Sequence, residues 1–177
     1  RMALCEDADL ALQKIEESIN ALNATIRDIR AYILDLRPRQ LRDDGLLDGL
    51  GRLLTEFRQN TQVEAVLTSP KSNHFKSLPS SHTMALFHIC QEALANVAKH
   101  AKAQKVSVDL WTTTDRVLLE IHDDGRGFNV EKARKAVGHG LTNMAARVQG
   151  VGGDLAITSV PGEGTTVLAW VPRGKDA

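Results

Sequence analysis

An apolar repeat at the start of the chain constrains the fold more than any other feature of the sequence. Its members recur with steps that alternate strictly between three and four residues, at Cys5, Ala8, Leu12, Ile15, Ile19, Leu22, Ile26, Ile29, Ile33 and Leu36. This spacing places them on one narrow stripe of a helix, the kind that pairs helices in a coiled coil. An ordinary long surface helix is the alternative. A paired helix needs a mate, either upstream in a longer protein or in a second copy.

The stretch after this stripe reads as a connection between two units. Pro38 is expected to end the helix at about Arg37, and residues 38–45 are rich in charge and contain both a proline and a glycine. We therefore divide the chain into a dimerisation helix over 1–37, a linker over 38–45 and a domain over 46–177. The first residue is Arg1 rather than Met, so we expect a piece of a longer protein.

Charge and cysteine content exclude some classes of function. The 177 residues contain 22 Lys and Arg and 22 Asp and Glu, and zero net charge argues against a protein that coats nucleic acid. The longest uncharged run, Ser77 to Gln91, is too short and too polar to span a membrane. Cys5 and Cys90 are too few for a disulfide framework. We expect a cytoplasmic domain with no direct nucleic-acid partner and no membrane contact of its own.

The remaining residues alternate between helical and strand patterns. Apolar spacing predicts a helix over 46–59, an edge strand over 63–68, and a second helix from Pro79 to about Ala103. Two hairpins follow, with a helix of about ten residues between them. Their strands are predicted over 105–110, 116–122, 154–160 and 165–171, and the helix lies within 138–153. Helices mixed with hairpins predict an α+β sandwich rather than a doubly wound parallel sheet.

Four polar segments are candidates for chemistry. On the second helix, Glu92, Asn96, Lys99 and His100 share the face opposite the apolar stripe. Such a face is often simply solvated, but here hard oxygen ligands for magnesium stand together with cations for phosphate. The first hairpin is followed by Asp123-Asp124-Gly125-Arg126-Gly127-Phe128, either a plain turn or a place where the backbone approaches a planar ligand. The carboxylate at the strand end can accept a hydrogen bond from an exocyclic amine.

The other two segments are glycine-rich. Gly138-His139-Gly140-Leu141 directly precedes a helix, whose first backbone amides form a ready anion site. Gly162-Glu163-Gly164-Thr165 is most simply a hairpin turn. Neither a Walker lysine loop nor Gly-x-Gly-x-x-Gly is found, so the common nucleotide folds are not indicated.

The order of the four segments resembles the Bergerat ATP-binding fold, shared by gyrase, heat-shock chaperone, histidine kinase and mismatch-repair ATPases. Residues 91–101, Gln-Glu-Ala-Leu-Ala-Asn-Val-Ala-Lys-His-Ala, together with Leu36-Arg37-Pro38 and residues 138–144, look like sensor histidine kinases of the nitrate-sensor and DesK-like kind. The resemblance covers the chain from about Leu22 onward. It implies a mixed sheet with helices on one face, preceded by a coiled-coil dimerisation helix.

The resemblance also implies roles for individual residues. Asn96 would ligate the Mg²⁺ held by ATP, with Glu92 beside it as a second ligand and accessory group, and Lys99 and His100 would contact the phosphates. Asp123 would receive the adenine amino group. The remaining ATP-binding residues implied by the resemblance are Gly125, Gly127 and Thr165 in the adenine pocket and Gly138, His139, Gly140 and Leu141 in the lid.

The chain departs from the family at the phospho-accepting histidine. The phospho-accepting histidine of these kinases lies on the first helix of a dimerisation hairpin and is followed by an acidic residue, whereas all six histidines here lie beyond the heptad stripe. The resemblance therefore implies a catalytic fragment that transfers the γ-phosphoryl of Mg-ATP to a histidine upstream of Arg1. It also implies a homodimer through the first helix and a response regulator with a helix-turn-helix output domain as partner.

Two other functions stay open. One is a different member of the superfamily, an anti-sigma-type serine kinase or an ATPase, although such proteins lack the heptad helix. The other is a non-catalytic dimerisation module whose nucleotide site is regulatory or empty.

Overall fold

The computed structural model describes residues 14–15, 18, 45–70, 75, 78–135 and 140–173. Its helices are α2 (Gly45–Asn60), α3 (Ser80–Asn96), the π-helical segment η3 (Val97–Ala101), α4 (Val130–Lys135) and α5 (Gly140–Gln149). The strands are β1 (Glu64–Thr68), β2 (Lys105–Thr112), β3 (Arg116–Asp123), β4 (Asp154–Ser159) and β5 (Thr165–Pro172). Of the predicted dimerisation helix, Lys14, Ile15 and Ser18 are described and are helical. The rest of that prediction, and residues 38–44 of the linker, lie outside the described residues.

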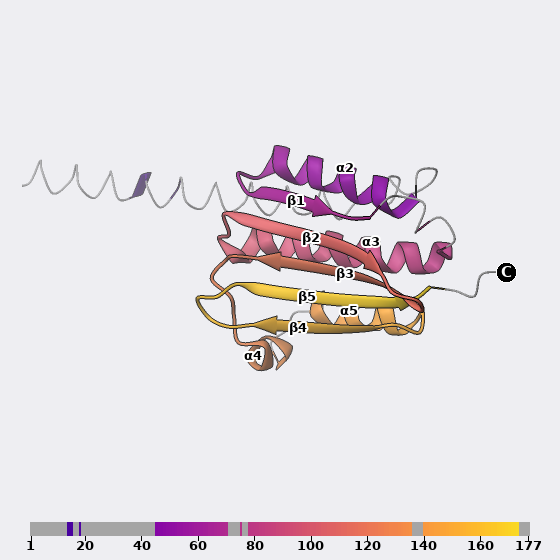
Figure 1. Cartoon of the computed structure of the whole chain (residues 1–177). Helices are drawn as coiled ribbons and strands as arrows, with labels where there is room; N and C mark the ends of the chain where they lie inside the picture. The colour runs from indigo at the N-terminus through magenta and orange to yellow at the C-terminus, as the bar shows by residue number, and fades with distance from the viewer. Residues whose placement is uncertain are drawn as a thin grey trace, which may run out of the picture.

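The strands form one mixed sheet with the order β1-β2-β3-β5-β4 (Figure 1). β1 pairs parallel with β2 at one edge, and the other three pairings are antiparallel. The predicted hairpins and the predicted edge strand are therefore confirmed, and the fold is the expected α+β sandwich. The order places β3 in the centre, so the end of β3 lies between β2 and β5.

Helix α3 packs against the inner face of the sheet and also against α2 and α5. Because it has neighbours on several sides, it is buried nearly all round, including Leu86, Phe87, Ile89 and Leu94 at 0% exposure. Helix α2 buries a single stripe instead, consisting of Leu46, Leu50, Leu53, Leu54 and Phe57. The half-buried polar residues near the end of α3 are therefore exceptions on an otherwise apolar helix.

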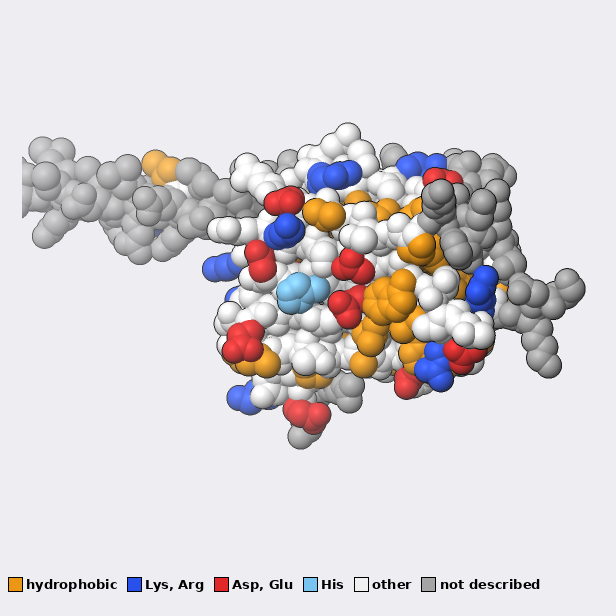
Figure 2. Space-filling view, viewed as in Figure 1, with side chains coloured by type: hydrophobic (Ala, Val, Ile, Leu, Met, Phe, Trp, Pro, Cys, Tyr) orange, Lys and Arg blue, Asp and Glu red, His pale blue; other side chains and the backbone are white. Residues whose placement is uncertain are grey.

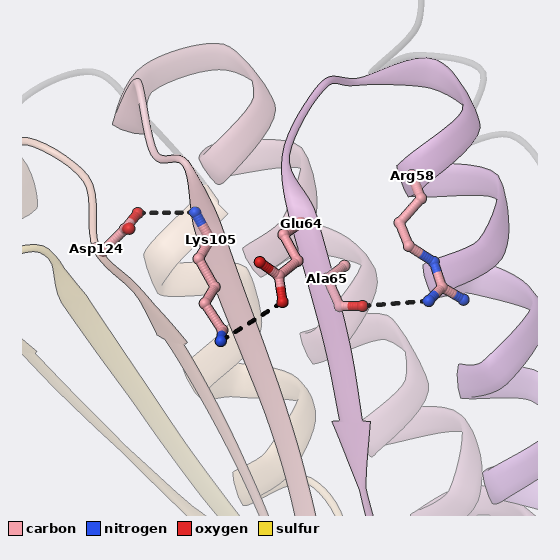
Figure 3. A network of polar contacts seen from close by, with 5 residues as sticks. All are labelled: Arg58, Glu64, Ala65, Lys105 and Asp124. Carbon is pink, nitrogen blue, oxygen red and sulfur yellow. Dashed lines mark hydrogen bonds and ion pairs between the residues drawn. The ribbon is translucent and has the colours of Figure 1, made fainter.

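Polar contacts join β1 to its neighbours at the sheet edge (Figure 3). Arg58 of α2 donates a hydrogen bond to the carbonyl oxygen of Ala65 at 3.3 Å, and the Lys105 ammonium lies 3.5 Å from the Glu64 carboxylate. That ion pair is exposed on both sides, so its contribution to stability is small.

The face of the sheet opposite α3 and α5 carries apolar side chains with acidic ones beside them (Figure 2). Both tryptophans of the chain lie on this outer face. Trp111 and Trp170 flank Leu118 on neighbouring strands, and the Arg116 guanidinium lies 4.0 Å from the ring centre of Trp170. The sequence predicts a strand that ends at residue 110, with Trp111 in a loop. The strand continues through Trp111 because this side chain packs in the cross-strand row.

The structure adds a short helix, α4, to the segment between Phe128 and Gly138 for which no helix was predicted. Its six residues are too few for a periodic apolar pattern to be recognised. Asn129 helps to start it, since its side-chain oxygen accepts a hydrogen bond from the backbone N–H of Lys132 at 2.9 Å.

Candidate nucleotide-binding site

A pocket of about 670 Å³ lies between the end of α3, the inner face of the sheet and the helices α4 and α5. Its lining residues come from all four glycine-containing or polar segments singled out in the sequence. From the helices these are Glu92, Ala93, Asn96, Val97, Lys99, His100, Ala101, Ala133, Leu141 and Met144, and from the strands and loops Ile121, Asp123, Arg126, Gly127, Phe128, Ile157, Thr165 and Val167.

Two cross-strand rows form the sheet side of the pocket. In one row Ile121, Val167 and Ile157 lie side by side on β3, β5 and β4. In the next row the same strands present Asp123, Thr165 and Ser159, of which Asp123 and Thr165 line the pocket. An apolar row next to a polar row suits a flat ring with a polar edge, because the ring can lie on the aliphatic side chains while its edge meets hydrogen-bonding groups.

Asp123 is the one charged residue among the buried side chains of the described chain, at 6% exposure. Burial raises the pKa of its carboxyl group, because removal from water disfavours the charged form. Two neighbours act in the opposite direction and lower this pKa: the backbone N–H of Gly125, which donates to Asp123 Oδ1 at 2.9 Å, and the side chain of Thr165, which lies opposite Asp123 on β5. A buried acceptor that is only partly satisfied by the protein is suited to receive a donor from a ligand.

Asp124 has a different role from its neighbour. It is exposed, and its Oδ1 accepts the backbone N–H group of Lys105 at 2.9 Å (Figure 3) and that of Gln104 at 2.8 Å. The hydrogen bond from Lys105 is the main cause that lowers the pKa of Asp124. This carboxylate therefore fixes the entry into β2 and is not part of the pocket.

The glycines after Asp123 allow close contacts within the protein. A Cβ on Gly125 would lie 2.5 Å from the carbonyl oxygen of Ala101 at the end of η3. Gly127 has φ +58°, and a Cβ there would lie 2.0 Å from the carbonyl oxygen of Val160. The sequence predicted that these glycines let a planar ligand approach the backbone closely. In the structure, the atoms that approach Gly125 and Gly127 closely are backbone atoms of Ala101 and Val160. Gly127 lines the pocket, whereas Gly125 lies beside it and supports Asp123.

The polar face predicted on the second helix opens onto the same pocket. Glu92, Asn96 and Lys99 are half-buried and His100 is exposed, and all four line the pocket. The helix continues as the π-helical segment η3 and ends at Lys102, whose φ of 54° is left-handed. The backbone N–H of Arg126 then donates to the Ala101 carbonyl oxygen at 2.8 Å, which joins the helix end to the loop after β3.

The structure brings together most, but not all, of the residues expected at the site. Glu92, Asn96, Lys99, His100, Asp123, Gly127, Leu141 and Thr165 line one pocket. Gly140 is the first residue of α5, and Gly138 and His139 lie outside the described residues.

Some residues that line the pocket were not predicted from the sequence to belong to the site. Arg126 lies within the motif of residues 123–128 but had no predicted role. Ile121, Ile157 and Val167 were predicted only as strand residues. Period-2 alternation places these three on the inner face with Asp123 and Thr165, so the signal was present. Only the pairing register shows that they adjoin.

The comparisons with known proteins bear directly on this site. A family profile described as "Histidine kinase-, DNA gyrase B-, and HSP90-like ATPase" matches residues 81–175, which include the pocket. The chain belongs to this ATPase family.

Its similar relatives are sensor kinases. Sensor histidine kinase MctS of Rhizobium johnstonii is 36% identical over 169 residues, which cover 94% of this chain and 36% of MctS. Sensor histidine kinase LiaS of Bacillus subtilis is 37% identical over 145 residues, covering 82% of this chain and 39% of LiaS. This chain therefore spans well under half the length of these relatives.

A solved structure shows the same fold. The histidine kinase domain of the blue-light activated histidine kinase of Erythrobacter litoralis superposes with a TM-score of 0.60 over 85% of this chain and 75% of that chain, at 20% identity.

In the part of this ATPase-family chain that the structure describes, no helix is both long and apolar enough to cross a membrane.

The donor set of the pocket is consistent with magnesium bound through a nucleotide. Asn96 and Glu92 line the pocket one helical turn apart and carry hard oxygen atoms of the kind that would suit such an ion. Among the described residues no group of three or more His, Cys, Asp and Glu is placed to hold a metal ion. A magnesium ion at this ATPase site would then complete its coordination with phosphate oxygens and water, as Mg²⁺ commonly does.

Proposed function

We propose that this domain binds Mg-ATP and is the catalytic part of a sensor histidine kinase, transferring the γ-phosphoryl group to a histidine upstream of Arg1. The observation that carries the proposal is the buried Asp123 carboxylate at the edge of an apolar floor, in a pocket whose helical side presents Asn96, Lys99 and His100. Asp123 and the apolar floor suit a purine, Asn96 suits a metal ion, and Lys99 and His100 suit a polyphosphate.

In this proposal Asp123 accepts a hydrogen bond from the adenine amino group, and Thr165 supports that carboxylate. The adenine ring lies on the row of Ile121, Val167 and Ile157, where burial of apolar surface favours binding. Selectivity for adenine follows because a base without a donor at this position would leave the ligand-facing lone pairs of a buried carboxylate unsatisfied, which is costly.

Lys99 and His100 are proposed to contact the phosphates, together with backbone amides at the start of α5. Asn96 would hold the magnesium ion, with Glu92 as accessory ligand. Bound there, the ion neutralises the charge that develops on the transferred phosphoryl group. Phosphoryl transfer depends chiefly on positioning and charge stabilisation, so a pocket without an activated Ser or Cys suits this reaction.

The acceptor and the partners belong to the wider proposal. We expect a histidine followed by Asp or Glu on a helix upstream of Arg1, a homodimer formed through the heptad stripe, and a response regulator with a helix-turn-helix output domain as the next phosphate acceptor. We expect the domain to act in the cytoplasm, where ATP is available.

Calorimetric titration of ATP with and without Mg²⁺ tests the site. Asp123→Asn is expected to weaken ATP binding by at least about ten-fold, because the new amide presents a donor to the adenine amine. Asn96→Ala is expected to remove the gain in affinity that Mg²⁺ gives. Asp109→Asn, which removes a carboxylate from the outer face of the sheet, is the matched control and should bind like the wild type.

Undiminished binding by Asp123→Asn would contradict the adenine assignment. The kinase activity has its own test, which is acid-labile phosphate transfer from radiolabelled ATP in a protein extended upstream of Arg1. ATP binding without transfer in that longer protein would favour a non-catalytic nucleotide module.

A further inference from the structure

We propose that Asp124 is a positioning residue for the phosphate contacts: its carboxylate holds the turn after η3 in place, and through that turn it fixes where Lys99 and His100 lie. The inference deepens the proposed function and rests on it, because it assumes that these two side chains contact the phosphates of ATP. Asp124 itself does not line the pocket and has no role in the predicted site.

The end of η3 depends on contacts from outside the helix. π-Helical turns are rare and occur mostly as single turns, and η3 spans the five residues Val97–Ala101. It ends at Lys102, whose φ of 54° is an uncommon left-handed conformation for a residue with a side chain. Lys99 and His100 lie in this turn, so their positions follow the backbone between Ala101 and the start of β2.

Two residues of the loop after β3 hold this backbone. Asp124 Oδ1 accepts the N–H group of Lys105 at 2.9 Å (Figure 3) and that of Gln104 at 2.8 Å. The N–H group of Arg126 donates to the carbonyl oxygen of Ala101 at 2.8 Å. The bond from Lys105 is the main cause that lowers the pKa of Asp124, so the acceptor is a charged carboxylate at neutral pH. Hydrogen bonds to charged groups are the stronger kind.

The adenine side of the site is held independently of Asp124. Asp123 is the last residue of β3 and pairs with Val106 on β2 and Thr165 on β5, so its place is set by the sheet. Removal of the Asp124 carboxylate instead takes the acceptor from two backbone N–H groups just after η3 and loosens that turn. The expected effect is therefore on the phosphate contacts and not on recognition of the base.

The test compares Mg-ATP with adenosine, which has the base but no phosphate. Calorimetry gives the dissociation constant of ATP directly and that of adenosine from its competition with ATP. In Asp124→Ala, ATP affinity is expected to fall by about 3- to 10-fold and adenosine affinity by less than about two-fold. Asp124→Asn retains a side-chain oxygen that can accept the same two N–H groups, so it is expected to restore most of the preference for ATP.

Asp115→Ala is the matched control. Asp115 lies in the turn at the other end of the β2–β3 hairpin, where its carboxylate accepts the Thr113 hydroxyl group at 3.0 Å and lies 3.4 Å from the Arg116 guanidinium. Its removal should leave the preference for ATP over adenosine unchanged. Amide hydrogen exchange over residues 99–105 should become faster in Asp124→Ala and not in Asp115→Ala. Thermal unfolding checks that all three variants are folded.

An equal loss of affinity for both ligands in Asp124→Ala overturns the inference, because it indicates a purely structural role. Unchanged amide exchange over residues 99–105 overturns it as well. If the wild type binds Mg-ATP no more tightly than adenosine, the proposed phosphate contacts fail and the inference fails with them. If the wild type prefers Mg-ATP and Asp124→Ala keeps that preference, the inference alone fails.

Discussion

At the scale of single residues, two adjacent aspartates show how strongly the backbone sets side-chain chemistry. Asp123 is the last residue of a strand whose inner face is buried, and Asp124 follows on the opposite side. Burial raises the pKa of Asp123, and backbone donors lower that of Asp124. From the sequence alone, either aspartate could be a turn residue or a ligand-binding group. Only the strand register shows that Asp123 faces the pocket and Asp124 does not.

The raised pKa of Asp123 predicts opposite pH trends for stability and for ATP affinity. The folded state holds this proton more tightly than the unfolded state, whose aspartate pKa is about 3.9. Between that value and the raised folded pKa, the contribution of Asp123 to the free energy of unfolding therefore falls as the pH rises. ATP affinity should instead weaken as the pH drops through the folded pKa, because the protonated carboxyl group is a poorer acceptor.

Denaturant titrations and calorimetry over a pH series measure the two trends, and the difference between wild type and Asp123→Asn isolates this residue from Asp124. The nucleotide-free Asp123→Asn variant is expected to be the more stable protein above the folded pKa of Asp123. Lower stability of that variant throughout the series would contradict the assigned effect of burial.

At the scale of elements, the β4–β5 turn and the loop after β3 depend on glycine. Gly127→Ala places a Cβ against the Val160 carbonyl in a left-handed backbone conformation. We expect it to lower the free energy of unfolding by about 2–4 kcal/mol. Gly51→Ala is the matched control, because no atom lies within 4 Å of its new Cβ in helix α2. It should raise stability by about 0.5–1 kcal/mol.

Chemical denaturation of both variants measures these changes. A Gly127→Ala protein as stable as the wild type would show that the loop moves easily, and the close packing described here would then not be needed for folding.

Element prediction succeeded where the apolar period was long or regular. The pattern of α2 and the alternation of β2 and β3 predicted their positions to within a few residues. Helix α4 was missed because it is short, and Trp111 was placed in a loop because its neighbours are threonines. The four motifs predicted most of the pocket residues. The lining residues Ile157 and Val167 were not predicted because their place beside Asp123 depends on the register between strands distant in the sequence.

At the scale of the whole molecule, the pocket lies between helical and sheet layers, so a bound nucleotide contacts both. Ligand binding to the folded state alone is expected to add about 2.7 kcal/mol at a concentration one hundred times the dissociation constant. Mg-ATP should therefore raise the unfolding temperature of the wild type and of Asp109→Asn, and that of Asp123→Asn by about half as much or less at the same concentration, because ten-fold weaker binding leaves only about 1.4 kcal/mol.

Differential scanning calorimetry measures this shift. A shift in Asp123→Asn equal to that of the wild type would mean that the nucleotide is held elsewhere or without its adenine.

The position of both tryptophans on the outer face has an experimental consequence. The sheet separates Trp111 and Trp170 from the nucleotide pocket. Their intrinsic fluorescence is therefore expected to change when the sheet unfolds and to change little when a ligand occupies the pocket. Neither Trp111 nor Trp170 lines the pocket, whereas Phe128 does. The fluorescence of a tryptophan introduced by Phe128→Trp would therefore report on the pocket wall.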